Sequence, residues 1–134
     1  MNIPHPTTLR IVLADDHRIV REGIKQIFAD TTDIRVVGEA ADGHAVLALM
    51  AQMNGQIDVL VLDIAMPGQD GLSVLSTLRR SQPRLAILVL STYPDRQYAV
   101  RCLKLGAKGY LNKSADPDDM VQAVLQIGAG GMYV

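Results

Sequence analysis

The sequence predicts an α/β protein with a doubly wound, five-stranded parallel sheet and five helices on both of its faces. Two observations support this fold class. Five short runs of apolar, β-type residues alternate strictly with five segments of helical periodicity, which implies right-handed crossovers between parallel strands. Two of the runs, 57–62 and 85–90, are apolar almost throughout, as expected for strands covered by helices on both faces. The length of 134 residues suits one domain with its own core.

The first half of the chain contains three of the strands and two of the helices. We expect the strands at residues 9–14, 34–40 and 57–62 and the helices at residues 17–30 and 45–53. The first helix is indicated by Val20, Ile24 and Ile27, which recur at three- and four-residue spacing along one face. The pair Asp42-Gly43, between a strand and a helix, is typical of a turn.

The second half of the chain contains the other two strands and three helices. We expect the helices at residues 71–80, 94–105 and 116–127 and the strands at residues 85–90 and 109–111. Pro83 ends the first of these helices, and Gly106 is well placed to cap the second. The third begins at Asp116, with Pro117 in its first turn and two further acids at the positive end of the helix dipole.

Composition and charge exclude several classes of protein. With 13 Lys and Arg against 14 Asp and Glu, the formal net charge of -1 lacks the basic excess typical of proteins that grip nucleic acid phosphates. The single cysteine, Cys102, excludes an intramolecular disulfide and a cysteine-rich zinc site. The chain has neither an apolar run near the ~18 residues that span a bilayer nor an N-terminal signal core. We therefore expect a cytoplasmic protein with no membrane partner, in which residues 1–8 form a flexible lead, 9–127 the folded domain, and 128–134 a loose end that begins a linker or tail.

Polar residues follow four of the five predicted strands where each strand ends. The first strand delivers Asp15 and Asp16, the third Asp63, the fourth Ser91 and the fifth Lys113. Ligands of open parallel sheets bind outside the carboxyl ends of the strands, so these side chains are expected to converge at one edge.

Each of these residues also has a simpler structural explanation. Asp16 alone would most often cap the following helix, Lys113 would be a solvated charge, and Ser91 a turn residue. The combination favours chemistry, because three neighbouring carboxylates repel one another unless a cation or a proton intervenes. Mg²⁺ is the natural ion, since it needs only one or two carboxylates together with phosphate and water. His17, next in the chain, is either a ligand or phosphocarrier or, as we expect, a helix-start residue that packs over the loop.

A metal at this edge would assist phosphoryl transfer, which requires neutralised oxygen charge and an in-line nucleophile. A carboxylate can serve as that nucleophile and form an acyl phosphate. Asp63 lies at the centre of the edge, and Lys113 and the Ser91 hydroxyl could each hold a phosphate oxygen.

Four separated motifs then resemble one family. The motifs are Asp15-Asp16, the segment 63–67 with Gly71, Ser91, and the segment 110–113. Together they resemble the receiver domain of bacterial two-component response regulators, over about residues 9–127. The segments 14–17, 21–23 and 37–40 resemble the NarL/FixJ branch, whose members usually carry a C-terminal helix-turn-helix output domain of the LuxR type. The resemblance implies a flavodoxin-like sheet with the strand order 2-1-3-4-5.

The resemblance also implies a role for each site residue. Asp63 would be the phosphoacceptor and Lys113 the cation that pairs with the phosphoryl group. Asp15 and Asp16 would hold Mg²⁺ together with Asp63 and the backbone carbonyl of Ala65. Ser91 would move toward the phosphoryl group and Tyr110 would follow as the aromatic switch residue. Many receivers have proline after the lysine, often with a cis bond, where this chain has Ser114.

The function implied is a phosphorylation-activated signalling switch that takes its phosphoryl group from a sensor histidine kinase. It would not be an enzyme, beyond catalysing its own phosphorylation and dephosphorylation. Partners would be the kinase and a second copy, as a homodimer on phosphorylation, with DNA contacted only through an output domain outside this chain. A free-standing receiver in a phosphorelay is the alternative within this class. An aspartyl-phosphate phosphohydrolase would need a proton donor where Ala65 stands, and a flavodoxin-like nucleotide module would need a phosphate loop where Asp15-Asp16 stand.

Overall fold

The computed structural model describes residues 8–66, 70–92 and 96–133 and confirms the predicted fold class. All strand pairs are parallel, and the sheet order is β2-β1-β3-β4-β5. The ten elements alternate strictly, as follows: β1 Leu9–Ala14, α1 Arg18–Ala29, β2 Ile34–Ala40, α2 Gly43–Gln52, β3 Val59–Asp63, α3 Gly71–Ser81, β4 Ala86–Ser91, α4 Arg96–Lys104, β5 Gly109–Asn112 and α5 Pro117–Gly128. Pro67 and Pro94, expected in a loop and at a helix start, lie outside the described residues.

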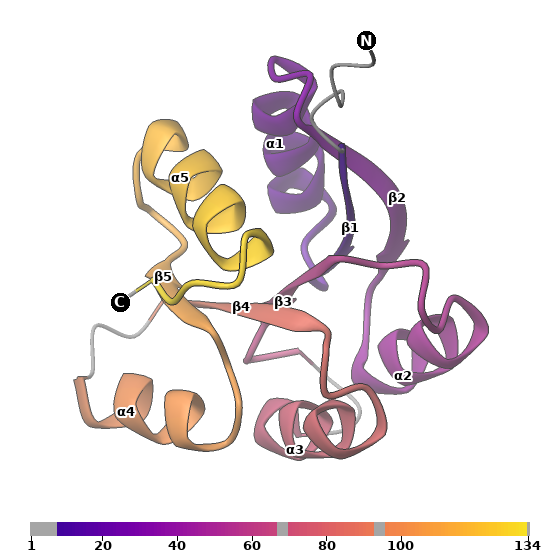
Figure 1. The fold of residues 1–134 in the computed structure, drawn as a ribbon. Helices are drawn as coiled ribbons and strands as arrows, with labels where there is room; N and C mark the ends of the chain where they lie inside the picture. The colour runs from indigo at the N-terminus through magenta and orange to yellow at the C-terminus, as the bar shows by residue number, and fades with distance from the viewer. Residues whose placement is uncertain (1–7, 67–69, 93–95, 134) are drawn as a thin grey trace, which may run out of the picture.

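Helices cover both faces of the sheet, as Figure 1 shows, with α1 and α5 on one side and α2, α3 and α4 on the other. Each face has its own apolar cluster. Alternate residues of a strand point to opposite faces, so Leu60 and Leu62 join the cluster beneath α2 and α3, whereas Val59 and Val61 join the one beneath α1 and α5. Every residue of β3 and β4 is buried, which explains their continuous apolar runs.

The central strand β3 is displaced toward its C-terminal end relative to the sequence prediction. It starts at Val59 rather than at residue 57, and it includes Asp63 as its last residue. Asp58 lies directly before the strand, and its Oδ2 accepts the backbone N–H of Arg10 at 2.8 Å and faces the guanidinium of the same residue at 3.3 Å. The backbone of Asp63 pairs with Leu90 of β4, so the sheet fixes the position of this residue.

The helix starts differ from the prediction at two positions. Asp42 caps α2, because its carboxylate accepts the backbone N–H of Ala45 at 2.8 Å, so the pair predicted as a turn begins a helix at Gly43. Asp116 occupies the N-cap position of α5 as predicted, and Pro117 follows it, but its side chain makes no capping hydrogen bond. The acids Asp118 and Asp119 in the first turn still complement the helix dipole.

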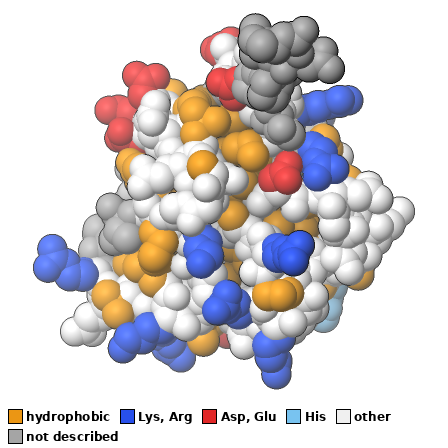
Figure 2. Space-filling view, viewed as in Figure 1, with side chains coloured by type: hydrophobic (Ala, Val, Ile, Leu, Met, Phe, Trp, Pro, Cys, Tyr) orange, Lys and Arg blue, Asp and Glu red, His pale blue; other side chains and the backbone are white. Residues whose placement is uncertain are grey.

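The end of α4 follows the prediction at Gly106. This residue has a positive φ of 116°, the left-handed conformation that glycine adopts most readily after a helix. A Cβ atom at this position would lie 2.6 Å from Cδ of Arg79 at the end of α3, so the C-terminal ends of α3 and α4 lie side by side. The last turns of these helices carry Arg79, Arg80, Arg101 and Lys104, which complement the negative ends of both dipoles. Lys and Arg side chains gather over this side of the molecule in Figure 2.

The sequence predicted a loose end after α5, but Tyr133 in this segment is hydrogen-bonded to the sheet. Tyr133 forms a parallel bridge to Gly109, accepting the backbone N–H of Tyr110 at 3.1 Å and donating its own to Lys108 at 2.9 Å. These bonds place Tyr133 beside β5 at the edge of the sheet. No helix among the described residues is long and apolar enough to cross a bilayer.

Candidate functional site

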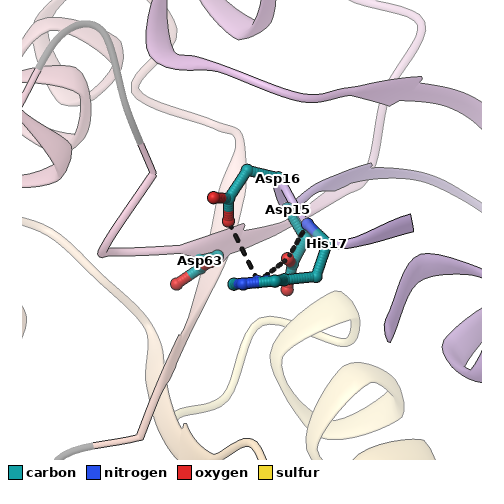
Figure 3. A group of neighbouring side chains, drawn as sticks. All are labelled: Asp15, Asp16, His17 and Asp63. Carbon is teal, nitrogen blue, oxygen red and sulfur yellow. Dashed lines mark hydrogen bonds and ion pairs between the residues drawn. The ribbon is translucent and has the colours of Figure 1, made fainter. Parts of the chain in front are cut away.

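The site lies at the carboxyl edge of the sheet, where the sequence placed it. Asp15 and Asp16 follow β1, Asp63 ends β3, Ser91 ends β4, and Lys113 follows β5. Asp15, Asp63 and Ser91 are the buried polar residues of the described chain, at 2%, 1% and 1% exposure. Figure 3 shows the carboxylates of Asp15, Asp16 and Asp63 together with His17.

Lys113 connects the two buried carboxylates. Its Nζ lies 2.8 Å from Oδ2 of Asp63 and 2.9 Å from Oδ2 of Asp15, and the side chain is largely buried. Burial by itself lowers the pKa of Lys113, but the hydrogen bonds to Asp63 and Asp15 outweigh it and raise the pKa above its usual value. A raised pKa means that the charge of Lys113 stabilises the folded state throughout neutral pH. This contribution is lost only when pH rises through the raised pKa. Because its side chain is largely buried and contacts two carboxylates, Lys113 is not a solvated surface charge.

Asp63 is positioned by its strand and by the turn that follows. Its Oδ1 accepts the backbone N–H of Ala65 at 3.0 Å, and its Oδ2 is the atom that faces Lys113. The turn is packed against the start of α3, where a Cβ on Gly71 would lie 2.2 Å from the carbonyl oxygen of Ile64. Glycine at position 71 therefore permits α3 to begin directly behind the turn that holds Asp63.

The acidic cluster has the features of a cation site. Oδ1 of Asp16 is a buried atom with no hydrogen bond, although Nδ1 of His17 lies 3.1 Å from it, whereas Oδ2 of Asp15 is neutralised by Nζ of Lys113 at 2.9 Å. Asp15, Asp16, His17 and Asp63 each offer a ligand atom, and these atoms all lie within 4.8 Å of one another. Buried carboxylate oxygens without hydrogen bonds are costly unless a cation neutralises them, and hard divalent ions prefer oxygen ligands. The residues present therefore fit a divalent metal.

His17 stands at the start of α1, as predicted. Its backbone occupies the N-cap position of α1, and its backbone N–H donates to Oδ1 of Asp15 at 2.8 Å. The ring lies against the two acids of the loop after β1: 65% of the side chain is exposed, and Nδ1 faces the carboxylates of Asp15 and Asp16. Asp16 is thus not the N-cap of α1, which removes the simpler explanation for that residue.

Ser91 and Tyr110 lie on the two neighbouring strands β4 and β5. Ser91 is buried at the end of β4, and its carbonyl accepts the backbone N–H of Lys113 at 3.0 Å, which ties this strand end to the site lysine. Tyr110 is partly buried and packs against the cluster beneath α4, one residue before Leu111. Cys102 is fully buried in α4, and burial raises the pKa of its thiol to about 11, which excludes a thiolate nucleophile at neutral pH.

Sequence reasoning missed one connection around the site. Arg21 on α1 donates through Nη1 to the backbone carbonyl of Asp15 at 2.6 Å, and its Nε lies 3.2 Å from a carboxylate oxygen of Glu39 at the end of β2. These contacts brace the turn that carries the acidic pair. In the sequence, segment 21–23 contributes only to the family resemblance, and no spacing rule links Arg21 to the backbone of Asp15.

Comparison with known proteins identifies the class. Residues 11–125 match the response regulator receiver domain family, so the chain belongs to this family. Receiver domains are phosphorylation-activated switches, and they are not enzymes in the ordinary sense.

Individual relatives are response regulators of the NarL type. The chain is 39% identical over 134 residues to the nitrate/nitrite response regulator protein NarL of Escherichia coli K12, covering all of this chain and 60% of the relative. It is 37% identical over 126 residues to the transcriptional regulatory protein DegU of Brevibacillus brevis, covering 94% of this chain and 52% of that protein. The chain therefore spans between half and two thirds of the length of these relatives.

Solved structures agree with this assignment. The signal receiver domain of a NarL response regulator from Mycobacterium tuberculosis superimposes with a TM-score of 0.86 at 34% identity, over 93% of this chain and 99% of that one. The isolated receiver domain of RcsB from Salmonella enterica serovar Typhimurium, solved with the phosphomimetic BeF3-, gives 0.87 at 27% identity, over 96% of this chain and 94% of that one.

Proposed function

We propose that this receiver domain accepts a phosphoryl group on Asp63 from a sensor histidine kinase. The observation that carries the proposal is the position of Asp63, which is buried at the end of the central strand with one oxygen held by Ala65 and the other by Lys113. A carboxylate in this setting is oriented for attack on phosphorus and forms an acyl phosphate. Lys113 then pairs with the added phosphoryl oxygens, which replace the carboxylate oxygen it contacts in the unmodified protein.

The metal at this site is proposed to be Mg²⁺. Asp15, Asp16 and Asp63 would hold it, with the backbone carbonyl of Ala65 as a further ligand. When bound, the ion neutralises charge on the phosphoryl oxygens as they approach the three carboxylates. The protein itself contributes the fixed orientation of Asp15, whose backbone carbonyl and Oδ1 are both held by hydrogen bonds.

The whole protein is proposed to be a DNA-binding transcription regulator of the NarL/FixJ branch. The relatives that this chain matches include a protein named as a transcriptional regulatory protein, and the chain spans only part of their length. In this proposal residues 128–134 lead to an output domain, phosphorylation favours a homodimer, and DNA is contacted through the output domain alone. A free-standing receiver in a phosphorelay is the second candidate, and the reading frame after Val134 separates the two.

The phosphoacceptor proposal is tested by intact mass. The chain is incubated with acetyl phosphate, with and without Mg²⁺. We expect an adduct of one phosphoryl group that forms with Mg²⁺ and much more slowly in its absence, because Lys113 contacts only two of the three carboxylates, those of Asp15 and Asp63. No adduct in the presence of Mg²⁺ would contradict the proposal.

Asp16→Ala is expected to weaken Mg²⁺ binding by at least about tenfold. Removing a residue that only hydrogen-bonds to a metal ligand typically lowers metal affinity by about 10–100-fold, and Asp16 is proposed to be a ligand itself. The affinity is measured by titration calorimetry. The matched control is Asp30→Ala, which removes an exposed carboxylate at the other end of α1 and should leave Mg²⁺ affinity unchanged. Equal affinities in the two variants would show that Asp16 is not a ligand.

Ser91→Ala is expected to separate phosphorylation from its structural response. The hydroxyl offers the phosphoryl group a hydrogen bond that the bare carboxylate does not require, a difference of ~1–3 kcal/mol, or about ten- to a hundredfold in a two-state equilibrium. The variant should still accept a phosphoryl group on Asp63 but lose most of the chemical shift changes at Tyr110 and along α4.

The matched control for this experiment is Ser81→Ala, whose hydroxyl binds the carbonyl of Thr77 on the exposed side of α3. NMR spectra of both variants are compared before and after phosphorylation. If Ser91→Ala shows the same shifts as the unaltered protein, the response travels by another path.

A further inference from the structure

The ring of His17 lies beside the carboxylates of Asp15 and Asp16 (Figure 3). Its Nδ1 is 3.1 Å from Oδ1 of Asp16 and 3.3 Å from Oδ1 of Asp15. The proposed function uses the carboxylates of this group but gives the imidazole no task. The ring is nevertheless directed into the site, and 65% of the side chain remains accessible to solvent.

We propose that His17 is a metal ligand and gives this site a preference for late first-row transition ions, such as Zn²⁺ and Co²⁺, over Mg²⁺. This inference rests on the proposed function, because it concerns the same acidic site. His17 would add a nitrogen ligand to that site and would change which metal ion the site binds most tightly.

The distances match the edges of a small coordination shell. With metal–ligand bonds of about 2.1 Å, two ligands of a tetrahedral ion are separated by about 3.4 Å, and two adjacent ligands of an octahedral ion by about 3.0 Å. The separations of 3.1 and 3.3 Å between Nδ1 and the two carboxylate oxygens fall between these values, so they fit a coordination shell of either geometry, and the choice of ion depends on the chemistry of the ligands. Only a small movement of Asp63 is then needed, because its ligand atom lies within 4.8 Å of the others.

Lys113 does not compete for the atoms that His17 approaches. The lysine lies at the Oδ2 atoms of Asp15 and Asp63, whereas the imidazole faces the Oδ1 atoms of Asp15 and Asp16. An ion beside His17 can therefore bind while the buried ion pairs of Lys113 persist. The buried Oδ1 of Asp16, which makes no hydrogen bond of good geometry, is the atom closest to Nδ1.

The chemistry of the donor set gives the selectivity. Mg²⁺ binds oxygen ligands and gains little from an imidazole, whereas Co²⁺ and Zn²⁺ bind imidazole nitrogen well. Three carboxylates and one imidazole form a mixed set of nitrogen and oxygen ligands. The imidazole therefore raises the affinity for the transition ion above what the carboxylates alone provide, whereas the affinity for Mg²⁺ comes from the carboxylates.

The test compares His17→Asn with the unaltered chain. Co²⁺, Zn²⁺ and Mg²⁺ are titrated separately by calorimetry, and the Co²⁺ titration is repeated by visible absorption, which reports the ligand set directly. We expect the affinity for Co²⁺ and Zn²⁺ to fall by at least about tenfold in the variant, and the affinity for Mg²⁺ to fall far less. The matched control is His44→Asn, which removes an exposed imidazole from α2 and should change none of the three affinities.

The outcomes separate this inference from the proposed function. If the unaltered chain binds Mg²⁺ but the ratio of Co²⁺ to Mg²⁺ affinity is the same in His17→Asn, the imidazole is only an N–H donor to the carboxylates and the inference is wrong. If the unaltered chain binds no Mg²⁺, the proposed metal site itself fails. An NMR titration with Zn²⁺ provides a second measurement without mutation: the ring signals of His17 should shift and those of His44 should not, and the reverse result would overturn the proposal.

Discussion

Asp63→Asn is expected to abolish the phosphoryl adduct that acetyl phosphate and Mg²⁺ produce on the unaltered chain. The substitution keeps the size of the side chain, and the amide oxygen can still accept the backbone N–H of Ala65 as the carboxylate does at 3.0 Å. It removes the nucleophilic oxygen, so the loss should be complete and not partial. Intact mass after a fixed incubation measures the effect.

Two comparisons make this result specific. Asp58→Asn removes a carboxylate that precedes the same strand but pairs with Arg10 at the opposite edge, and it should take up one phosphoryl group normally. An adduct that persists in Asp63→Asn would place the phosphoryl group elsewhere. Asp15 and Asp16 would then be the first candidates, because their carboxylates lie in the same cluster.

The sequence predicted the fold class, the strand order implied by the family resemblance and the edge that carries the site. These features depend on patterns that extend over many residues, so no single position decides them. The continuous apolar runs of β3 and β4 require burial on both faces, and the residues that directly follow parallel strands must meet at one edge. Asp15, Asp63 and Lys113 converge for this reason alone.

The details that the sequence did not predict depend on contacts between distant residues. Asp58, predicted inside a strand, precedes β3, and its carboxylate accepts the backbone N–H of Arg10, 48 positions earlier. Tyr133, predicted in a loose end, pairs beside β5. Local composition contains no signal for either contact, since both are set by which strand ends lie next to each other after the sheet has formed.

His17 and Asp42 show how local rules fail in a different way. An aspartate before a helix is expected to cap it, and Asp42 does so, whereas Asp16 leaves the cap position to His17 and contributes its carboxylate to the acidic cluster. The spacing of the two aspartates does not distinguish them. What differs is the strand before each, because β1 lies next to β3 and so brings Asp16 close to Asp63, while β2 is an edge strand.

The largest stability effect is expected for Lys113→Met. Methionine keeps an unbranched side chain of similar length but removes the ammonium group that lies 2.8 Å from Asp63 and 2.9 Å from Asp15. Both carboxylates are almost fully buried, and removing one partner of a buried ion pair leaves charge without compensation, which typically costs about 3–5 kcal/mol. We therefore expect the free energy of unfolding, measured by urea denaturation in the presence of a chelator, to fall by about this amount.

Lys25→Met is the matched control, because Lys25 also contacts two carboxylates, those of Glu22 and Glu39, at 2.9 and 3.0 Å. That group is exposed, and exposed ion pairs contribute about 0–1 kcal/mol. The contrast between the two variants therefore measures what burial adds to the same kind of pairing. If Lys113→Met is no less stable than Lys25→Met, the buried carboxylates are not held by Lys113.

Mg²⁺ provides a further check on Lys113→Met, because an ion bound among the carboxylates can replace part of the missing charge. Binding to the folded state alone stabilises by about 2.7 kcal/mol at an ion concentration 100 times the dissociation constant. The variant lacks the nearby positive charge of the ammonium group, which repels a second cation, and should bind Mg²⁺ more tightly. The same Mg²⁺ concentration should therefore stabilise it more than it stabilises the unaltered chain. Equal stabilisation of the two proteins would mean that Lys113 and the metal act on different carboxylates. The proposal that both neutralise one acidic cluster would then be wrong.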